Sequence, residues 1–164
     1  MALRNIVTKG DPILRKISRA VTKFNDRLFL LLDDMHQTLA VSNGVGLAAP
    51  QVGVLMRVIL VDRGEGDIIE MINPLITHRE GEEEEIEGCL SVPGKYGIVK
   101  RPAKVKANYL DRHGVYHEIE AEGFLARIIC HETDHLNGIL YVDNVVRMLT
   151  EEELAQLERQ KGEE

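Results

Sequence analysis

The amino-acid sequence predicts an α+β fold whose strands are mainly antiparallel, and two observations support this prediction. Apolar residues recur at intervals of three and four in two separate segments, residues 25–41 and 122–136, which is the spacing of one buried helix face. Shorter apolar segments come in neighbouring pairs joined by turn residues, as in β-hairpins. Hairpins combined with a few helices favour an α+β arrangement over alternating strand–helix units.

Length and composition are those of a globular domain. The 164 residues are expected to form one domain, residues 1–164, in which 150–164 form a helical or frayed tail. Apolar residues make up 44% of the chain and charged residues 29%, and no apolar run reaches the length of a membrane span. The first residues lack the apolar core of a signal peptide, so we expect a cytoplasmic protein without a membrane partner.

The charge pattern argues against DNA as a ligand. The formal net charge is −7, and the lysines and arginines are scattered rather than gathered in a stripe. The acidic run at residues 80–85 predicts a solvated loop or edge. The two cysteines are expected to be thiols, since cytoplasmic proteins seldom contain disulfides, and Cys130 is expected to be a small core residue.

The N-terminal half predicts one helix followed by a hairpin. The helix covers residues 25–41, with Asn25 as its N-cap. Its apolar stripe consists of Leu28, Leu31, Leu32, Met35 and Leu39. Residues 57–61 and 68–72 predict two strands paired across a glycine-containing turn, and Asn73-Pro74 is expected to close this unit.

The C-terminal half predicts a second hairpin and two helices. Residues 105–110 and 115–121 form the hairpin, because they are separated by a turn sequence. A helix follows over residues 122–136 and ends at an Asn-Gly pair. Residues 150–157 begin like a capped helix, with three acidic residues in the first turn.

The helix at 122–136 contains His131-Glu132-Thr133-Asp134-His135. Two histidines four residues apart lie on one helical face and can bind one divalent metal. Glu132 stands beside the first histidine, where it can accept a proton from a water molecule. The pattern therefore indicates a catalytic metal site, and two histidines that simply pack in the core are the alternative.

A catalytic metal site of this kind needs a third protein ligand. Position 141 is Tyr, which excludes the longer metallopeptidase pattern with a third histidine. Residues 151–153 are glutamates at about the spacing used by other zinc peptidases, and Cys89 is the other candidate. Spacing leaves both ligand candidates open, and with a glutamate the chain would be a zinc peptidase. A non-catalytic binding module stabilised by a metal is a further alternative.

Three motifs of the chain resemble those of the peptide deformylase family. They are Gly44-Val45-Gly46-Leu47-Ala48-Ala49-Pro50-Gln51, Glu87-Gly88-Cys89-Leu90-Ser91 and the histidine segment 131–135. The Gly-Asp-Pro-Ile-Leu-Arg sequence at 10–15 is similar to the family too, so the resemblance extends to about Val142. It implies antiparallel sheets around a central metal-binding helix, in a single catalytic domain that removes the formyl group from N-terminal formylmethionine.

The resemblance also implies a ligand set and partners. The metal is held by Cys89, His131 and His135, and Fe(II) is the usual ion, which nickel, cobalt or zinc can replace. Glu132 serves as general base and acid. The expected partners are formylmethionyl N-termini of nascent polypeptides near the ribosome, and the protein is expected to be a monomer.

Further roles follow from the same resemblance. The side-chain amide of Gln51 and the backbone N–H of Leu90 are the expected donors to the developing oxyanion. Leu90 is also expected to help line the methionine pocket. The expected substrate-binding residues are Gly44, Gly46, Gly88, Phe124, Leu125 and Ile128, although plain core packing would explain Phe124 and Ile128 equally well. Glu87 and Asp134 are candidates to hold the ligand imidazoles, with Arg101 as an ion-pair partner. The chain departs from the family's usual residues at Cys130 and Tyr96.

Overall fold

The structure, a computed structural model, describes residues 2–162. Its α-helices are α1 (Asp26–Ser42), α2 (Gly123–Leu136) and α3 (Glu151–Gly162). Its 3-10 turns are η1 (Pro12–Arg15), η2 (Ala49–Val52) and η3 (Tyr141–Asp143). Its strands are β1 (Gly46–Ala48), β2 (Val58–Asp62), β3 (Ile68–Glu80), β4 (Glu83–Cys89), β5 (Val92–Arg101), β6 (Lys104–Leu110), β7 (Tyr116–Glu122) and β8 (Val145–Met148).

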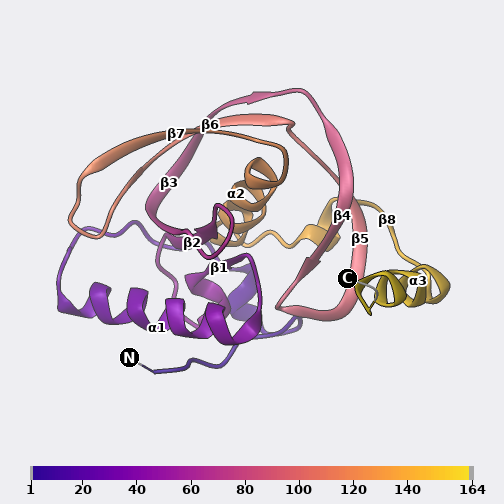
Figure 1. The fold of residues 1–164 in the computed structure, drawn as a ribbon. Coiled ribbons are helices and arrows are strands. Elements are labelled where there is room, and N and C mark those ends of the chain that lie inside the picture. The colour runs from indigo at the N-terminus through magenta and orange to yellow at the C-terminus, as the bar shows by residue number, and fades with distance from the viewer. Residues whose placement is uncertain (1, 163–164) are drawn as a thin grey trace.

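The strands form two antiparallel sheets around α2. The five-stranded sheet has the order β1-β2-β3-β6-β7, and the three-stranded sheet has the order β4-β5-β8. Figure 1 shows α2 in the middle of the molecule, with α1 on one side of the larger sheet and α3 beside the smaller one. The predicted α+β class with a central helix is therefore confirmed. Within residues 2–162, no helix is long and apolar enough to cross a membrane.

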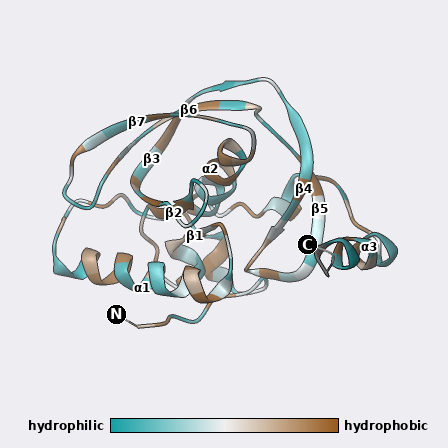
Figure 2. Ribbon diagram, viewed as in Figure 1, coloured by the Kyte–Doolittle hydropathy of each residue, from teal (hydrophilic) through white to brown (hydrophobic). Residues whose placement is uncertain are grey.

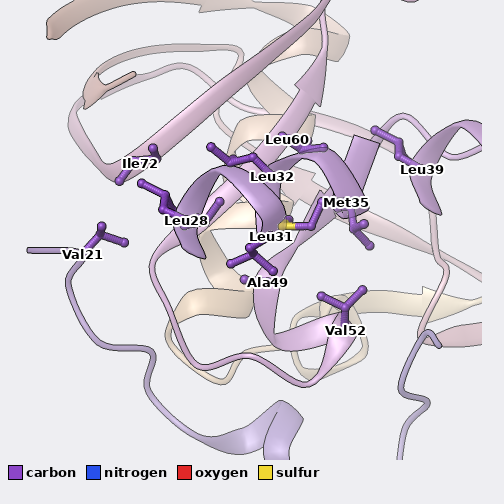
Figure 3. Packing of buried hydrophobic residues seen from close by; sticks show 12 residues of the cluster. Val21, Leu28, Leu31, Leu32, Met35, Leu39, Ala49, Val52, Leu60 and Ile72 are labelled. Atoms are coloured by element: carbon purple, nitrogen blue, oxygen red, sulfur yellow. The ribbon is translucent and has the colours of Figure 1, made fainter. Parts of the chain in front are cut away.

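Strand β2 is buried between α1 and α2, which explains why its sequence is an unbroken apolar run. Val58 and Leu60 pack in one core cluster with the apolar face of α1, while Ile59 packs with α2. Successive side chains of a strand point to opposite faces, so both faces of β2 need apolar residues. Figure 3 shows the α1 side of this core, with Leu32 close to Leu60.

Helix α1 matches its sequence prediction to within one residue. The Asn25 side chain accepts a hydrogen bond from the Leu28 backbone N–H at 3.2 Å, as an N-cap does. Asn43 ends the helix in the left-handed conformation, with φ +59°. Figure 2 shows apolar and polar bands alternating along α1, as expected for a helix with one buried face.

The hairpin of β2 and β3 closes at Ile72, just before Asn73-Pro74 as predicted, but the second strand is longer than the predicted 68–72. Strand β3 runs on to Glu80, pairing first with β2 and then with β6, with a register shift between Ile72 and Leu75. Asn73 has φ +51°, and its side chain hydrogen-bonds to both the N–H and the C=O of Val21. These bonds hold the irregular residue in place, so the strand changes partner there without ending.

The acidic run begins at the end of β3, passes through the connection at residues 81–82 and continues along an edge strand, as the predicted loop or edge allows. Glu83, Glu84 and Glu85 belong to β4, which pairs only with β5 in its sheet, and all three are exposed. The hairpin of β4 and β5 and the strand β8 were not predicted. Glutamate has low strand propensity, and pairing with β5 outweighs that preference here.

A partly buried charge cluster joins α1, β3 and the turn before β7. The Arg112 guanidinium donates to both Glu70 carboxylate oxygens, at 2.9 and 2.6 Å, and to Asp33 at 3.0 Å. His36 Nε2 lies 2.7 Å from Glu70. Burial raises the pKa of the Glu70 carboxyl, but the hydrogen bonds from Arg112 and His36 outweigh it and lower that pKa to about 2.

Replacing Glu70 by Gln is expected to lower the free energy of unfolding at pH 7 by about 2 kcal/mol, since hydrogen bonds to a charged group are lost. Because the folded-state pKa is depressed, the stabilisation is complete above the ordinary pKa of 4.5 and is lost as pH falls towards 2. Urea unfolding at pH 7 and pH 3 measures both effects. Glu120→Gln, on an exposed ion pair, is the control and should change stability little; equal losses in both variants would contradict the prediction.

Candidate metal centre

Helix α2 and the end of β4 bring three potential ligands together. His131 and His135 lie one turn apart on α2, and Cys89 is the last residue of β4. One ligand atom of each, the thiol sulfur and a ring nitrogen of either histidine, lies within 4.8 Å of the other two. Cys89 Sγ is 3.4 Å from His135 Nε2. The structure thus brings Cys89 next to His135, which lies 46 residues further along the chain.

The donor set and its surroundings fit a divalent cation. A thiolate and two imidazoles are typical ligands of zinc and of similar transition metals, and three ligands leave a position for reaction. Burial lowers the pKa of His131, but Glu132, Cys89 and Glu87 outweigh burial and raise it to about 10. Surroundings that favour a proton on this imidazole also favour a metal cation beside it.

A buried ion-pair network holds the first histidine. His131 Nδ1 lies 2.8 Å from Glu87 Oε1, which leaves Nε2 for a metal. Arg101 donates two hydrogen bonds to Glu87, at 2.8 and 2.9 Å, and one to Asp134 at 2.7 Å. Arg127 donates to Glu87 at 2.6 Å. Burial acts to raise the pKa of Glu87, but Arg101 and His131 outweigh it and hold that pKa well below its ordinary value.

Glu132 has the surroundings of a group that exchanges protons. Its side chain lines the cavity beside His131, the residue is 5% exposed, and Oε1 has no hydrogen-bond partner among the described residues. Burial, partly offset by His131, raises the pKa of the Glu132 carboxyl to about 7. A carboxyl group with a pKa near neutrality can both accept and return a proton at physiological pH.

Gln51 is held rigidly at the other side of the cluster. Its Oε1 accepts a hydrogen bond from the Ala48 N–H at 2.9 Å, and its Nε2 donates to Ser91 Oγ at 3.1 Å. Nε2 lies 3.6 Å from Cys89 Sγ. The amide is therefore fixed with its donor end towards the ligand cluster, which is the orientation that stabilising a negative oxygen requires. Ser91 had no predicted role, although it belongs to the motif that contains Cys89.

The cavity has a volume of about 600 Å³, within the usual range for small-molecule sites. Phe124, Ile128 and Leu90 line it, Phe124 being 63% exposed and Ile128 buried. Leu125 does not line it and packs instead against the core between α2 and the larger sheet. The expectation for Leu125 is corrected for a geometric reason: residues 124 and 128 share a helix face, and 125 is turned about 100° away.

At three of the glycines that line the cavity, a neighbouring side chain leaves no room for a Cβ. A Cβ at Gly46 would come within 2.6 Å of Glu132 Oε2, and one at Gly88 within 2.5 Å of the Tyr96 ring. A Cβ at Gly44 would lie 2.9 Å from Leu90 Cδ1. All three glycines line the cavity, and the expectation that they allow close approach of the substrate backbone stays a prediction.

Tyr141 is the main residue near the ligands that the sequence interpretation missed. It is 1% exposed, its ring stacks on His131 at 6.1 Å between centroids and 23° between planes, and its hydroxyl donates to Lys95 O at 3.2 Å. One feature of the sequence could have pointed to Tyr141: it stands at the position where the longer metallopeptidase pattern has its third histidine. Arg127 was missed because a helical arginine within an apolar run gives no indication of its partners.

The glutamates considered as a third ligand lie elsewhere. Residues 151–153 form the first turn of α3, and Glu153 pairs with Arg147 at 2.6 Å. Among residues 2–162, the group of potential metal ligands contains none of these three. The peptidase alternative therefore lacks its ligand in this fold.

Three convergent ligands, a buried carboxyl group beside them and a cavity open to solvent define a metal-dependent hydrolase. Comparison with known proteins gives the particular family. The family model described as polypeptide deformylase matches residues 3–151, and the chain belongs to the peptide deformylase family. Members of this family are metalloenzymes, and the activity of the chain is removal of the N-formyl group from nascent peptides.

Relatives of known name are similar over nearly the whole chain. The peptide deformylase of Thermoanaerobacter pseudethanolicus is 52% identical over 157 residues, which cover 96% of this chain and 98% of that protein. That of Caldicellulosiruptor bescii is 55% identical over 163 residues, covering 99% and 97%. The crystal structure of a peptide deformylase from Legionella pneumophila has a TM-score of 0.84 at 41% identity, covering 99% of both chains. A peptide deformylase from Synechococcus elongatus in complex with actinonin has a TM-score of 0.84 at 40% identity, covering 97% of this chain and 86% of that one.

Proposed function

We propose that this chain is an Fe(II)-dependent peptide deformylase that acts on the formylmethionyl N-termini of newly made polypeptides. The observation that carries the proposal is the convergence of Cys89, His131 and His135 in a cavity that also contains Glu132. Nickel, cobalt or zinc could occupy the same ligands. We further propose that residues 1–164 are one catalytic domain, active as a monomer in the cytoplasm near the ribosome.

The proposed mechanism assigns a task to each side chain. A divalent ion bound by Cys89 and the two histidines supplies Lewis acidity, which polarises a carbonyl group and makes water more acidic. Glu132 accepts the proton of the attacking water at its carboxylate and then passes it to the departing amine. The Gln51 amide and the Leu90 N–H donate hydrogen bonds to the formyl oxygen as it gains negative charge. Ile128, Phe124 and Leu90 contact the methionine side chain.

The proposed function is tested with the protein purified without oxygen and loaded with Fe(II) or Ni(II). Formyl-Met-Ala-Ser should release formate, and acetyl-Met-Ala-Ser should react far more slowly, because an acetyl group is larger and less electrophilic than a formyl group. Formate is measured directly with formate dehydrogenase. Absence of formate release with both metals would contradict the proposal.

If Fe(II) is the bound ion, the activity of the enzyme should be sensitive to oxygen. The Fe(II) form should lose its activity in air within hours, whereas the Ni(II) form should keep it, because Fe(II) is readily oxidised and Ni(II) is not. Residual formate release after timed exposure to air measures both forms. Loss in both forms would indicate oxidation of the Cys89 thiolate instead, and an Fe(II) form that is stable in air would refute the assignment of iron.

Replacing Gln51 by Glu is expected to lower kcat about 100- to 1000-fold, the usual effect of removing an oxyanion donor. Glutamate keeps the oxygen that accepts from Ala48 N–H but loses the NH₂ donor, so the fold should persist. Steady-state kinetics with formyl-Met-Ala-Ser measure the change. Ser91→Ala, which removes only the anchor of the amide, should cost less, and a Gln51→Glu variant with normal kcat would rule out this role.

A further inference from the structure

Helix α3 lies almost entirely beyond the residues that the family model matches, yet it reaches the active-site cavity. The family match ends at residue 151, and α3 begins at Glu151. Leu157, in the middle of α3, lines the same cavity as His131 and Glu132. The proposed metal ligands, Glu132 and Gln51 all lie before α3, so we consider substrate contact, and not the chemical step, as the contribution of α3 to the cavity.

The start of α3 is fixed against the smaller sheet. Strand β8 pairs with β5 through Gly97 and Met148, and Leu149 N–H donates to Tyr96 O at 2.9 Å. Thr150 and Glu153 then form a reciprocal cap, with bonds of 3.1 Å in each direction. These contacts tie the helix to the side of the cavity formed by Tyr96 and place it beside β5 and β8 (Figure 1).

Leu157 is one of few apolar residues on a polar helix. Most residues of α3 up to position 160 are exposed, whereas Leu154 and Leu157 are half-buried. A helix with so little apolar surface gains little free energy from packing against the rest of the protein. Leu157 therefore presents an apolar side chain to the cavity, where it stays partly open to solvent.

We infer that Leu157 is a specificity-determining residue, which contacts the substrate residues that follow the formylmethionine and favours apolar side chains there. This inference rests on the proposed function. The formyl group has to lie next to Glu132 and the ligand cluster, and the methionine next to Ile128 on α2. Tyr96 and Leu157 line the same cavity, of about 600 Å³, so the residues that follow the methionine can contact Leu157 while the methionine lies beside Ile128.

The test compares substrates within each enzyme variant. The probes are formyl-Met-Leu-Leu, formyl-Met-Asp-Asp and formylmethionine amide, which has no following residue and serves as the reference. The ratio of two kcat/KM values does not depend on how much of a variant is folded. In the wild-type Ni(II) enzyme, formyl-Met-Leu-Leu should be preferred to formyl-Met-Asp-Asp.

Leu157→Ala should reduce the kcat/KM of formyl-Met-Leu-Leu relative to the reference about tenfold, mainly through KM, as removal of an apolar contact does. Leu157→Lys should go further and shift preference towards formyl-Met-Asp-Asp, an effect that a purely structural role of Leu157 cannot produce. Leu154→Ala is the matched control, because it removes the same atoms from the same helix outside the cavity lining, and its substrate ratios should equal those of the wild type.

The outcomes separate this inference from the proposed function. If the wild-type enzyme hydrolyses none of the three probes, the proposed function fails. If it hydrolyses them and both Leu157 variants keep the wild-type ratios, deformylation stands and the role of Leu157 is wrong. Ratios that change equally in the Leu154 and Leu157 variants would also overturn the inference, since they would reflect the position of α3 and not a contact of Leu157.

Discussion

Replacing Glu132 by Gln is expected to lower kcat for formyl-Met-Ala-Ser about 1000-fold without loss of metal. The amide has nearly the shape of the carboxylate but cannot accept a proton, and general base catalysis contributes about 10²- to 10⁴-fold in enzymes. Glu132 Oε1 has no hydrogen-bond partner among the described residues, so the substitution breaks no bond of that atom. Steady-state kinetics and metal analysis of the same sample measure the two quantities.

Two controls make this prediction specific. Glu132→Asp keeps an acid on a shorter side chain and should retain more activity than Glu132→Gln, because the base is present but farther from the water. The KM of the Gln variant should stay close to that of the wild type, since binding of the peptide does not use the proton. A Glu132→Gln enzyme with more than about a tenth of wild-type kcat would contradict the role of Glu132 as base.

Replacing Cys89 by Ala is expected to reduce bound metal to below about a tenth of an equivalent and activity in proportion, because a three-ligand site loses its thiolate. Cys130→Ala is the matched control. Cys130 is a buried thiol next to His131, but it packs in the core between α2 and the larger sheet, away from the ligand group. Its metal content should equal that of the wild type.

Both variants are checked by measuring the metal-to-protein ratio after desalting, with elemental mass spectrometry for the metal. Cys89→Ser is an informative third sample, since a hydroxyl group can weakly replace the thiolate and should leave an intermediate metal content. If Cys89→Ala kept one equivalent of metal while Glu152→Ala or Glu153→Ala lost it, the ligand assignment would be reversed in favour of a glutamate.

Sequence periodicity was enough to predict the elements that carry the two histidines and the main core. The apolar stripe of α1 and the stripe of α2 each face a core cluster, so burial imposed the pattern that revealed them. The ligand pair on α2 follows from the same periodicity, because its spacing of four residues is local. Local geometry of this kind is readable from one segment of the chain.

The features that the sequence did not predict depend on partners far away in the chain. Glu83 to Glu85 form a strand only because β5 pairs with them, and β3 passes through Asn73 only because Val21 binds the Asn73 side chain. Tyr141 becomes part of the site by stacking on His131. Cys89 could be named from its own segment only as one candidate, and its selection needed the resemblance of three separate motifs.

The exposed glutamates of β4 bear on how the chain avoids aggregation. An unpaired sheet edge is a template on which a second copy can add a strand, and β4 cannot be covered where it lines the cavity. Glu83, Glu84 and Glu85 give this edge a dense negative charge. Two such edges repel each other on approach, so these carboxylates oppose intermolecular β-sheet growth along β4 while the other end of the strand lines the cavity.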